Sequence, residues 1–143
     1  MPLIAITLFT TLMVVAIVHI GWAFGMSWPA KTRAELPAMV VGIPAGSPMP
    51  PAALTSAVGL AIFGLGAAAL WGAGLISLWR ADTYRTWVLA AIAAIFALRG
   101  IMTYLPFGPL QASVEPFRSL DRRYFAPLCL LLAAGYFAIF LSL

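Results

Sequence analysis

Four long apolar stretches, separated by charged and proline-rich segments, constrain this chain more than any other feature. They cover about residues 3–24, 53–78, 86–104 and 125–143, and each approaches the roughly 20 residues that a helix needs to cross a bilayer. Stretches this long and evenly apolar do not suit barrel strands, and no water in the bilayer satisfies an irregular backbone. The sequence therefore predicts an all-α fold, a polytopic membrane protein with a four-helix transmembrane bundle, as one domain over residues 1–143.

Charge is scarce, which excludes other classes of protein. Only 8% of the residues are charged and 64% are hydrophobic, whereas a soluble domain carries about 25% charged residues. A soluble globular fold and a disordered chain are both excluded. The net charge of +4 comes mostly from residues between the apolar stretches and forms no basic stripe, so no nucleic-acid partner is predicted. No basic residue precedes the first stretch, which is longer than the apolar region of a signal peptide, and we expect it to be a retained span.

Small residues predict how the second and third spans pack. Gly64, Ala68 and Gly72 recur at four-residue spacing in the second span, which clears one helix face for a close neighbour. We expect all three to face another helix. The third span has a similar strip, formed by Ala90, Ala93, Ala94 and Ala97. A close contact between these two spans is therefore predicted.

Two long connections, residues 25–51 and 105–124, join the spans. The first contains six prolines, which exclude a regular helix through all of it. Its apolar centre, residues 36–43, would be poorly placed in water, so we expect this connection to fold back on the end of the bundle. Because hairpin connections alternate between sides, both long loops are predicted on one face of the membrane.

His19 is the only histidine and lies about one turn before the end of the first span. Trp22 follows three residues later, on the same side of a helix. An ionisable side chain inside a span is costly and indicates a function. The alternative is that the His–Trp pair simply anchors the helix at the membrane interface.

Arg99 and Asp121 are the other polar candidates near the long-loop face. Arg99 lies in the third span, close enough to its end to reach the headgroups. Asp121 is placed to cap the fourth helix and to pair with Arg99 or a neighbouring arginine. We predict that His19, Arg99 and Asp121 converge in one polar site. Pro127 predicts that the fourth helix either kinks there or begins afresh at that residue.

Motifs of metal, cofactor and covalent chemistry are absent. Cys129 is the only cysteine, so neither an intrachain disulfide nor a CxxC site can form. One imidazole does not make a zinc site, and haem held by two histidines would require a dimer. No nucleophile–base pair, carboxylate pair or glycine-rich phosphate loop is present. No metal and no cofactor are predicted.

Four segments together resemble a known family. They are residues 19–25, 46–52, 99–100 and 117–130, and they are similar to the bacterial membrane-protein family catalogued as domain of unknown function 3995. The last segment is the most specific, because an acidic residue, an arginine, an aromatic residue and Pro-Leu-Cys follow in this order. The resemblance covers nearly the whole chain. It implies a small four-span protein of the bacterial inner membrane, and it implies no activity.

Three functions are compatible with these residues. The first is a membrane protein that binds an anionic or lipid-like small ligand at one end of the bundle, with an arginine on any anionic group. The candidate ligand-binding residues are His19, Trp22, Arg99, Asp121, Arg122 and Tyr124. The alternatives are an accessory or assembly subunit of a larger membrane complex, and a membrane enzyme acting on a lipid or quinone-like substrate. Membrane lipids, a second copy of the chain or another membrane protein are the expected partners.

The positive charges also predict an orientation. The two long loops carry five of the lysines and arginines, and the short connection between them carries two. Positive loops favour the cytoplasmic side. Both chain termini are therefore expected outside.

Overall fold

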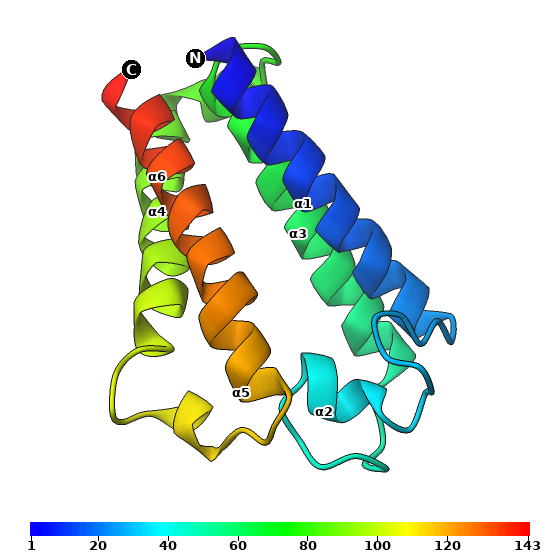
Figure 1. Ribbon diagram of the computed structural model, residues 1–143. Coiled ribbons are helices and arrows are strands. Elements are labelled where there is room, and N and C mark those ends of the chain that lie inside the picture. The colour runs from blue at the N-terminus through cyan, green and yellow to red at the C-terminus, as the bar shows by residue number, and fades with distance from the viewer.

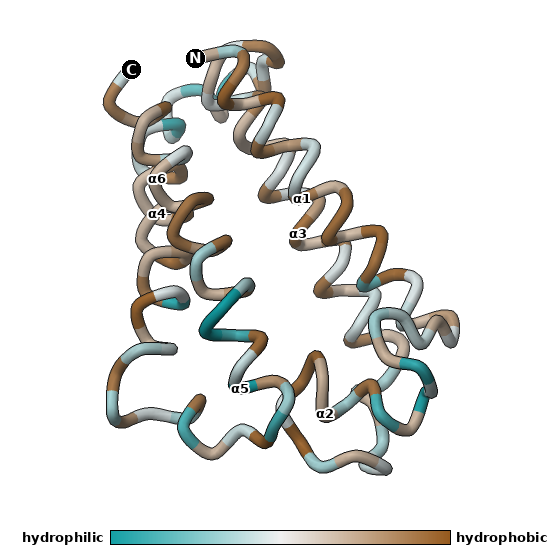
Figure 2. Tube along the Cα trace, in the orientation of Figure 1, coloured by the Kyte–Doolittle hydropathy of each residue, from teal (hydrophilic) through white to brown (hydrophobic).

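The computed structural model describes residues 1–143 and contains helices and no strands. Four of its helices are long and apolar enough to cross a membrane, and Figure 2 shows the hydrophilic residues mainly in the loops and at helix ends. The long helices are α1 (Pro2–Ala23), α3 (Ala52–Gly72), α4 (Arg85–Met102) and α6 (Ala126–Leu141). The predicted all-α, four-span fold class is confirmed.

The second span is shorter than the sequence predicted. Helix α3 ends at Gly72, where an end near residue 78 was expected. Gly74 adopts a left-handed conformation with φ of 73°. Its N–H donates to the C=O of Trp71, and the next N–H, of Leu75, donates to the C=O of Leu70. This pair of bonds is a Schellman motif, which stops the helix although the following residues are still apolar.

The long helices form two pairs. Helix α1 lies along α3, and α4 lies along α6. The two pairs meet near the chain termini and diverge toward the long loops (Figure 1). The buried core lies in the half of the bundle nearest the termini, and it is made by Ala5, Leu8, Leu12, Ala69, Leu89, Ile92, Ala93, Leu132, Tyr136 and Ile139.

The small residues of α3 pack differently from the prediction. A Cβ atom at Gly66 would lie 3.3 Å from the Cβ of Leu12, and one at Gly59 would also meet α1. Gly72 lies against α4, but Gly64 is exposed with nothing within 4 Å of its added Cβ. The prediction that all three small residues face a helix is therefore wrong for Gly64. Gly64 lies about 200° around the helix from Gly66 at 3.6 residues per turn, so one face cannot include both.

The predicted close contact of the second and third spans is present only near the connection that joins them. Helices α3 and α4 meet near their connection, where a Cβ at Gly72 would lie 2.7 Å from Leu89 Cδ2, and they diverge from there (Figure 1). The close neighbour of α4 is α6, since a Cβ at Gly100 would lie 2.7 Å from Leu130 Cγ and 3.0 Å from the Ala126 oxygen. Small residues permit two helices to approach closely, but they do not specify which helix packs against them.

Both long loops lie at the end opposite the chain termini, as predicted (Figure 1). The first contains the short helix α2 (Leu36–Val40), whose first three residues are buried. The two loops are also joined, because the N–H of Val114 donates to the C=O of Gly42 at 3.0 Å. The expected return of the first loop onto the bundle end is confirmed.

The remaining elements are short. A 3₁₀ turn, η1 (Trp79–Tyr84), joins α3 to α4, and another, η2 (Pro109–Ala112), lies in the second long loop. One turn of α-helix, α5 (Phe117–Leu120), and a π turn, η3 (Asp121–Phe125), lead directly into α6. The fourth span is thus a continuous helical segment that begins in the loop region.

Candidate functional site

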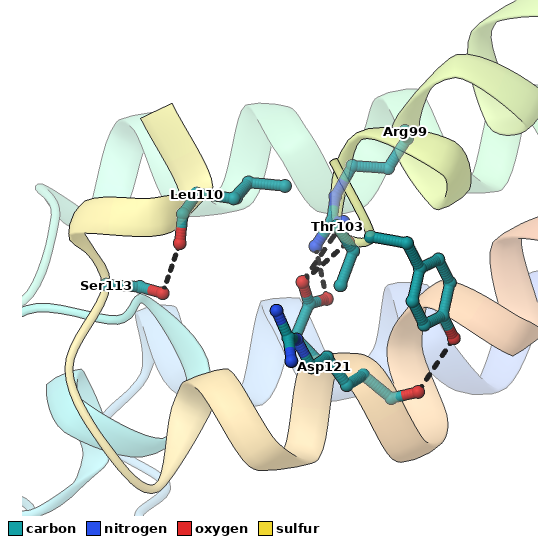
Figure 3. A network of polar contacts seen from close by, with 7 residues as sticks. Arg99, Thr103, Leu110, Ser113 and Asp121 are labelled. Carbon is teal, nitrogen blue, oxygen red and sulfur yellow. Dashed lines mark hydrogen bonds and ion pairs between the residues drawn. The ribbon is translucent and has the colours of Figure 1, made fainter. Parts of the chain in front are cut away.

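Arg99 and Asp121 form an ion pair between α4 and the π turn. Arg99 Nη2 lies 2.6 Å from Asp121 Oδ1. The hydroxyl of Thr103 donates to Asp121 Oδ2 at 2.7 Å and accepts from Arg99 Nη1 at 2.8 Å (Figure 3). The Asp121 side chain is 2% exposed and that of Arg99 is 35% exposed. We call these three residues the polar clamp, because their hydrogen bonds close on one another and hold α4 to the start of the fourth span.

Thr103 was not among the residues singled out from the sequence. It follows Arg99 by four positions, so both side chains lie on one face of α4. That spacing was the available signal. A hydroxyl next to a buried ion pair satisfies the oxygen lone pairs that would otherwise remain unpaired.

The π turn explains how the helix passes Pro127. The N–H of Ala126 donates to the C=O of Asp121, five residues back. In the same register the C=O of Arg122 would accept from residue 127, but proline has no N–H. The hydroxyl of Tyr104 donates to this carbonyl at 2.8 Å instead.

Two expectations about this segment are corrected. The fourth helix does not begin afresh at Pro127, and it accommodates the proline by the π turn that precedes it. Asp121 makes no capping hydrogen bond, because the helical segment already begins at Phe117 and the carboxylate bonds to α4. Such π turns occur frequently at functional sites. Tyr104, which supplies the missing donor, was also not singled out from the sequence.

His19 lies apart from the polar clamp. Its Nδ1 donates to the C=O of Val15 at 2.8 Å, and its ring centroid is 4.7 Å from that of Trp22. No hydrogen bond or ion pair joins it to Arg99 or Asp121. The predicted convergence of His19, Arg99 and Asp121 is therefore wrong for His19. The reason is the divergence of the helix pairs, which separates the end of α1 from the end of α4 (Figure 1).

A cavity of about 290 Å³ adjoins His19. We call it the His19 cavity. It lies between the end of α1, helix α2 and the start of α3. Its lining residues are His19, Trp22, Val40, Val41, Met49, Pro50, Leu54, Thr55 and Val58. No charged residue lines it, and Thr55 is the polar member that the sequence did not indicate.

Arg122 and Tyr124 belong to neither arrangement through their side chains. Both are exposed, Tyr124 by 54%. The guanidinium of Arg123 lies over the Tyr124 ring at 5.5 Å. Neither the Arg122 nor the Tyr124 side chain makes a hydrogen bond or ion pair with the Asp121 carboxylate, whose partners are Arg99 and Thr103.

The two arrangements differ in what they can do chemically. In the polar clamp, the guanidinium of Arg99 already bonds to a carboxylate and a hydroxyl, so its charge is balanced within the protein. In the His19 cavity, Nε2 of His19 makes no hydrogen bond with the protein. The polar groups of the clamp bond to one another, whereas His19, which lines the cavity, keeps one ring nitrogen without a protein partner.

The fold and these sites define a class, the small all-helical protein with four helices able to cross a membrane. Within it, this chain belongs to the family described as "Protein of unknown function (DUF3995)", whose pattern matches residues 12–136. Neither the curated proteins nor the solved structures contain a match.

Proposed function

We propose that this chain is a multi-pass membrane protein that binds a small lipid-like ligand in the His19 cavity. The observation that carries the proposal is a mostly apolar cavity of about 290 Å³ lined by His19, whose Nε2 has no protein partner. Ligand sites are concave and mostly apolar, with a few polar groups, and they start at about 300 Å³. The long-loop end supplies both the cavity and a short path to the headgroup region.

A lipid-like ligand is better supported than an anionic one. The lining has no lysine or arginine, and the arginine expected to hold an anion, Arg99, is bonded to Asp121 and Thr103. An anion in an apolar site without a cation or several donors is disfavoured. The tail of a lipid, in contrast, suits the valine, leucine and methionine side chains of the lining.

We further propose that the protein lies in the bacterial inner membrane with its long loops in the cytoplasm. Arg33 donates to the carbonyls of Trp22 and Met26, and Arg118 donates to those of Gln111 and Ser113. These cations are held at the long-loop end, and arginines near span ends favour the cytoplasmic side. Both termini would then be periplasmic, which labelling of terminal cysteines in intact cells tests.

Filling the cavity tests the proposed binding. Leu54 lines the cavity, and Leu60 lies on the same helix outside it; both are exposed, by 56% and 66%. We expect Leu54→Trp to reduce the copurified lipid-like ligand at least about tenfold, because the larger side chain occupies space that the ligand needs. A tenfold loss of affinity corresponds to about 1.4 kcal/mol of binding free energy. Leu60→Trp is the matched control and should retain the ligand. Native mass spectrometry of the protein released from mild detergent measures both, and equal retention in the two variants would contradict the proposal.

A second candidate function, an accessory subunit, is favoured by a different surface. A wholly apolar groove of about 480 Å³ lies between α4 and α6. Its lining includes the predicted alanine strip, Ala90, Ala93, Ala94 and Ala97, together with Phe137 and Phe140. Ala94 is exposed in this strip, whereas Ala93 is buried. Small residues of this kind admit a helix of another subunit. Ala94→Leu should release a copurifying partner under this alternative and leave the ligand of the His19 cavity in place.

An enzyme acting on a lipid or quinone-like substrate would use the same cavity. His19 could exchange a proton there, but no second acid, base or cation lines the cavity to stabilise a developing charge. General acid–base catalysis is most effective when such a group is positioned beside it. Binding is therefore better supported than catalysis.

A further inference from the structure

With His19 neutral, the polar side chains of the His19 cavity have no hydrogen left to donate to a ligand. Nδ1 of His19 donates to the C=O of Val15 at 2.8 Å. The indole N–H of Trp22 donates to the C=O of Trp28 at 2.6 Å. The hydroxyl of Thr55 donates to backbone C=O groups of the preceding turn, the nearer at 3.2 Å.

The hydrogen bond from His19 fixes which ring nitrogen is free to accept. A carbonyl oxygen only accepts, so Nδ1 carries the proton in the bond to Val15. In a neutral imidazole the other nitrogen, Nε2, then presents a lone pair. The Thr55 oxygen also keeps lone pairs, whereas the Trp22 indole has none to offer. While His19 is neutral, the side chains of the cavity can therefore only accept hydrogen bonds.

We propose that the ligand is an uncharged amphiphile with a free hydroxyl group, whose O–H donates to Nε2 of His19. This inference rests on the proposed function. A hydroxyl supplies the donor that the lining lacks, and the apolar tail lies against the aliphatic residues, Val40, Leu54 and Val58 among them. Two opposed acceptors with no hydrogen between them leave both unsatisfied, which costs free energy in an apolar site.

The same lining disfavours other classes of ligand. An ether or ketone offers only acceptors, so it faces Nε2 without a hydrogen bond. A carboxylate or phosphate meets no lysine or arginine in the lining, and it meets no side-chain donor while His19 is neutral. An ammonium group could donate, but no carboxylate lines the cavity to balance its charge, and an unpaired buried charge is costly.

The single histidine allows a direct test. In this chain labelled with ¹⁵N-histidine, the imidazole signals come from its single histidine, His19. The probes are 1-dodecanol, its methyl ether and dodecanoic acid, added to protein in nanodiscs. We expect dodecanol to shift the Nε2 resonance saturably and to bind about tenfold more tightly than the ether, as one hydrogen bond predicts. The ether and the acid should leave Nε2 unshifted.

A second arm distinguishes the source of the hydroxyl. Nanodiscs containing dioleoylglycerol, a bilayer lipid with one free hydroxyl, are compared with nanodiscs containing trioleoylglycerol, in which that hydroxyl is blocked. An Nε2 shift with dioleoylglycerol supports a ligand drawn from the bilayer. A shift with dodecanol alone supports a free alcohol that enters from water.

A variant and three outcomes complete the test. His19→Phe keeps a ring beside Trp22, and by native mass spectrometry it should lose the preference for dodecanol over the ether. Equal binding of dodecanol and ether to the native protein would overturn the hydroxyl inference and leave the proposed lipid binding intact. A shift caused by dodecanoic acid would overturn it in favour of an anionic ligand. Failure of every probe to bind, together with equal ligand retention in Leu54→Trp and Leu60→Trp, would overturn the proposed function as well.

Discussion

The two helix pairs place polar residues at the same end of the bundle, but they differ in whether the hydrogen-bonding groups of these residues are paired within the protein. On the α4/α6 pair, Arg99, Thr103 and Asp121 satisfy one another, and the carboxylate is buried. On the α1/α3 pair, His19 uses one ring nitrogen locally and leaves the other unpaired beside a cavity. A polar group within a span therefore does not by itself indicate a binding site. The useful observation is whether its hydrogen-bonding capacity is already used.

Asp121→Asn should have the largest effect on stability. The substitution removes the charge that balances Arg99, and breaking a buried pair from one side costs about 3–5 kcal/mol. The partial exposure of Arg99, 35%, places the expected loss near the lower end, about 3 kcal/mol. Unfolding in mixed dodecyl sulfate micelles, followed by circular dichroism, measures it. Glu35→Gln, an exposed carboxylate in the first loop, is the control, and equal stability of the two variants would refute the structural role of the clamp.

Gly100→Ala should cost somewhat less, about 1–3 kcal/mol from overpacking. A Cβ there meets Leu130 at 2.7 Å and the backbone oxygen of Ala126 at 3.0 Å, so α4 and α6 must separate next to the clamp. Gly64→Ala is the matched control, because its Cβ enters open space, and it should be neutral or slightly stabilising. Helix-pair separation can be measured by spin-label distances. Equal stability losses at the two glycines would contradict the assigned packing.

Tyr104→Phe should destabilise the protein by about 1 kcal/mol, the net value of one hydrogen bond. The lost donor leaves the C=O of Arg122 without the bond that Pro127 cannot supply. Tyr84→Phe serves as the comparison, since Tyr84 is 63% exposed and has no hydrogen-bond partner in the protein. Hydrogen exchange of the π-turn amides should accelerate in Tyr104→Phe alone. Unchanged exchange in that variant would show that the tyrosine does not support the π turn.

His19→Phe should have the smallest effect on stability, below about 0.5 kcal/mol, as for substitutions that leave packing intact. The phenyl ring can keep the contact with Trp22, and the lost bond joins two residues of one helical turn. The same unfolding measurement in micelles tests this prediction. A loss as large as that of Asp121→Asn would place His19 among the structural residues and remove the contrast between the two helix pairs.

Parts of the polar clamp could be predicted from the sequence. An unpaired arginine inside a span costs free energy, and pairing with a carboxylate lowers that cost. Asp121 was the best placed carboxylate near the same membrane face, so its pairing with Arg99 could be predicted. Thr103 and Tyr104 were missed, although the four-residue spacing from Arg99 to Thr103 was visible. The role of Tyr104 depends on the π register at Pro127, which no local pattern in the sequence specifies.

Length, hydropathy and the alternation of connections were enough to predict four helical spans and the common side of the long loops. These follow from the absence of water in the bilayer, which leaves long apolar segments only one way to satisfy their backbones. The tertiary structure decided which helices pair, that Gly64 faces outward, and that His19 is separated from Arg99. Helices α1, α3 and α6 carry apolar residues on all sides, so hydropathy does not distinguish their lipid-facing surface from the packed one. Shape complementarity between particular side chains makes that choice, and it exists only in the assembled bundle.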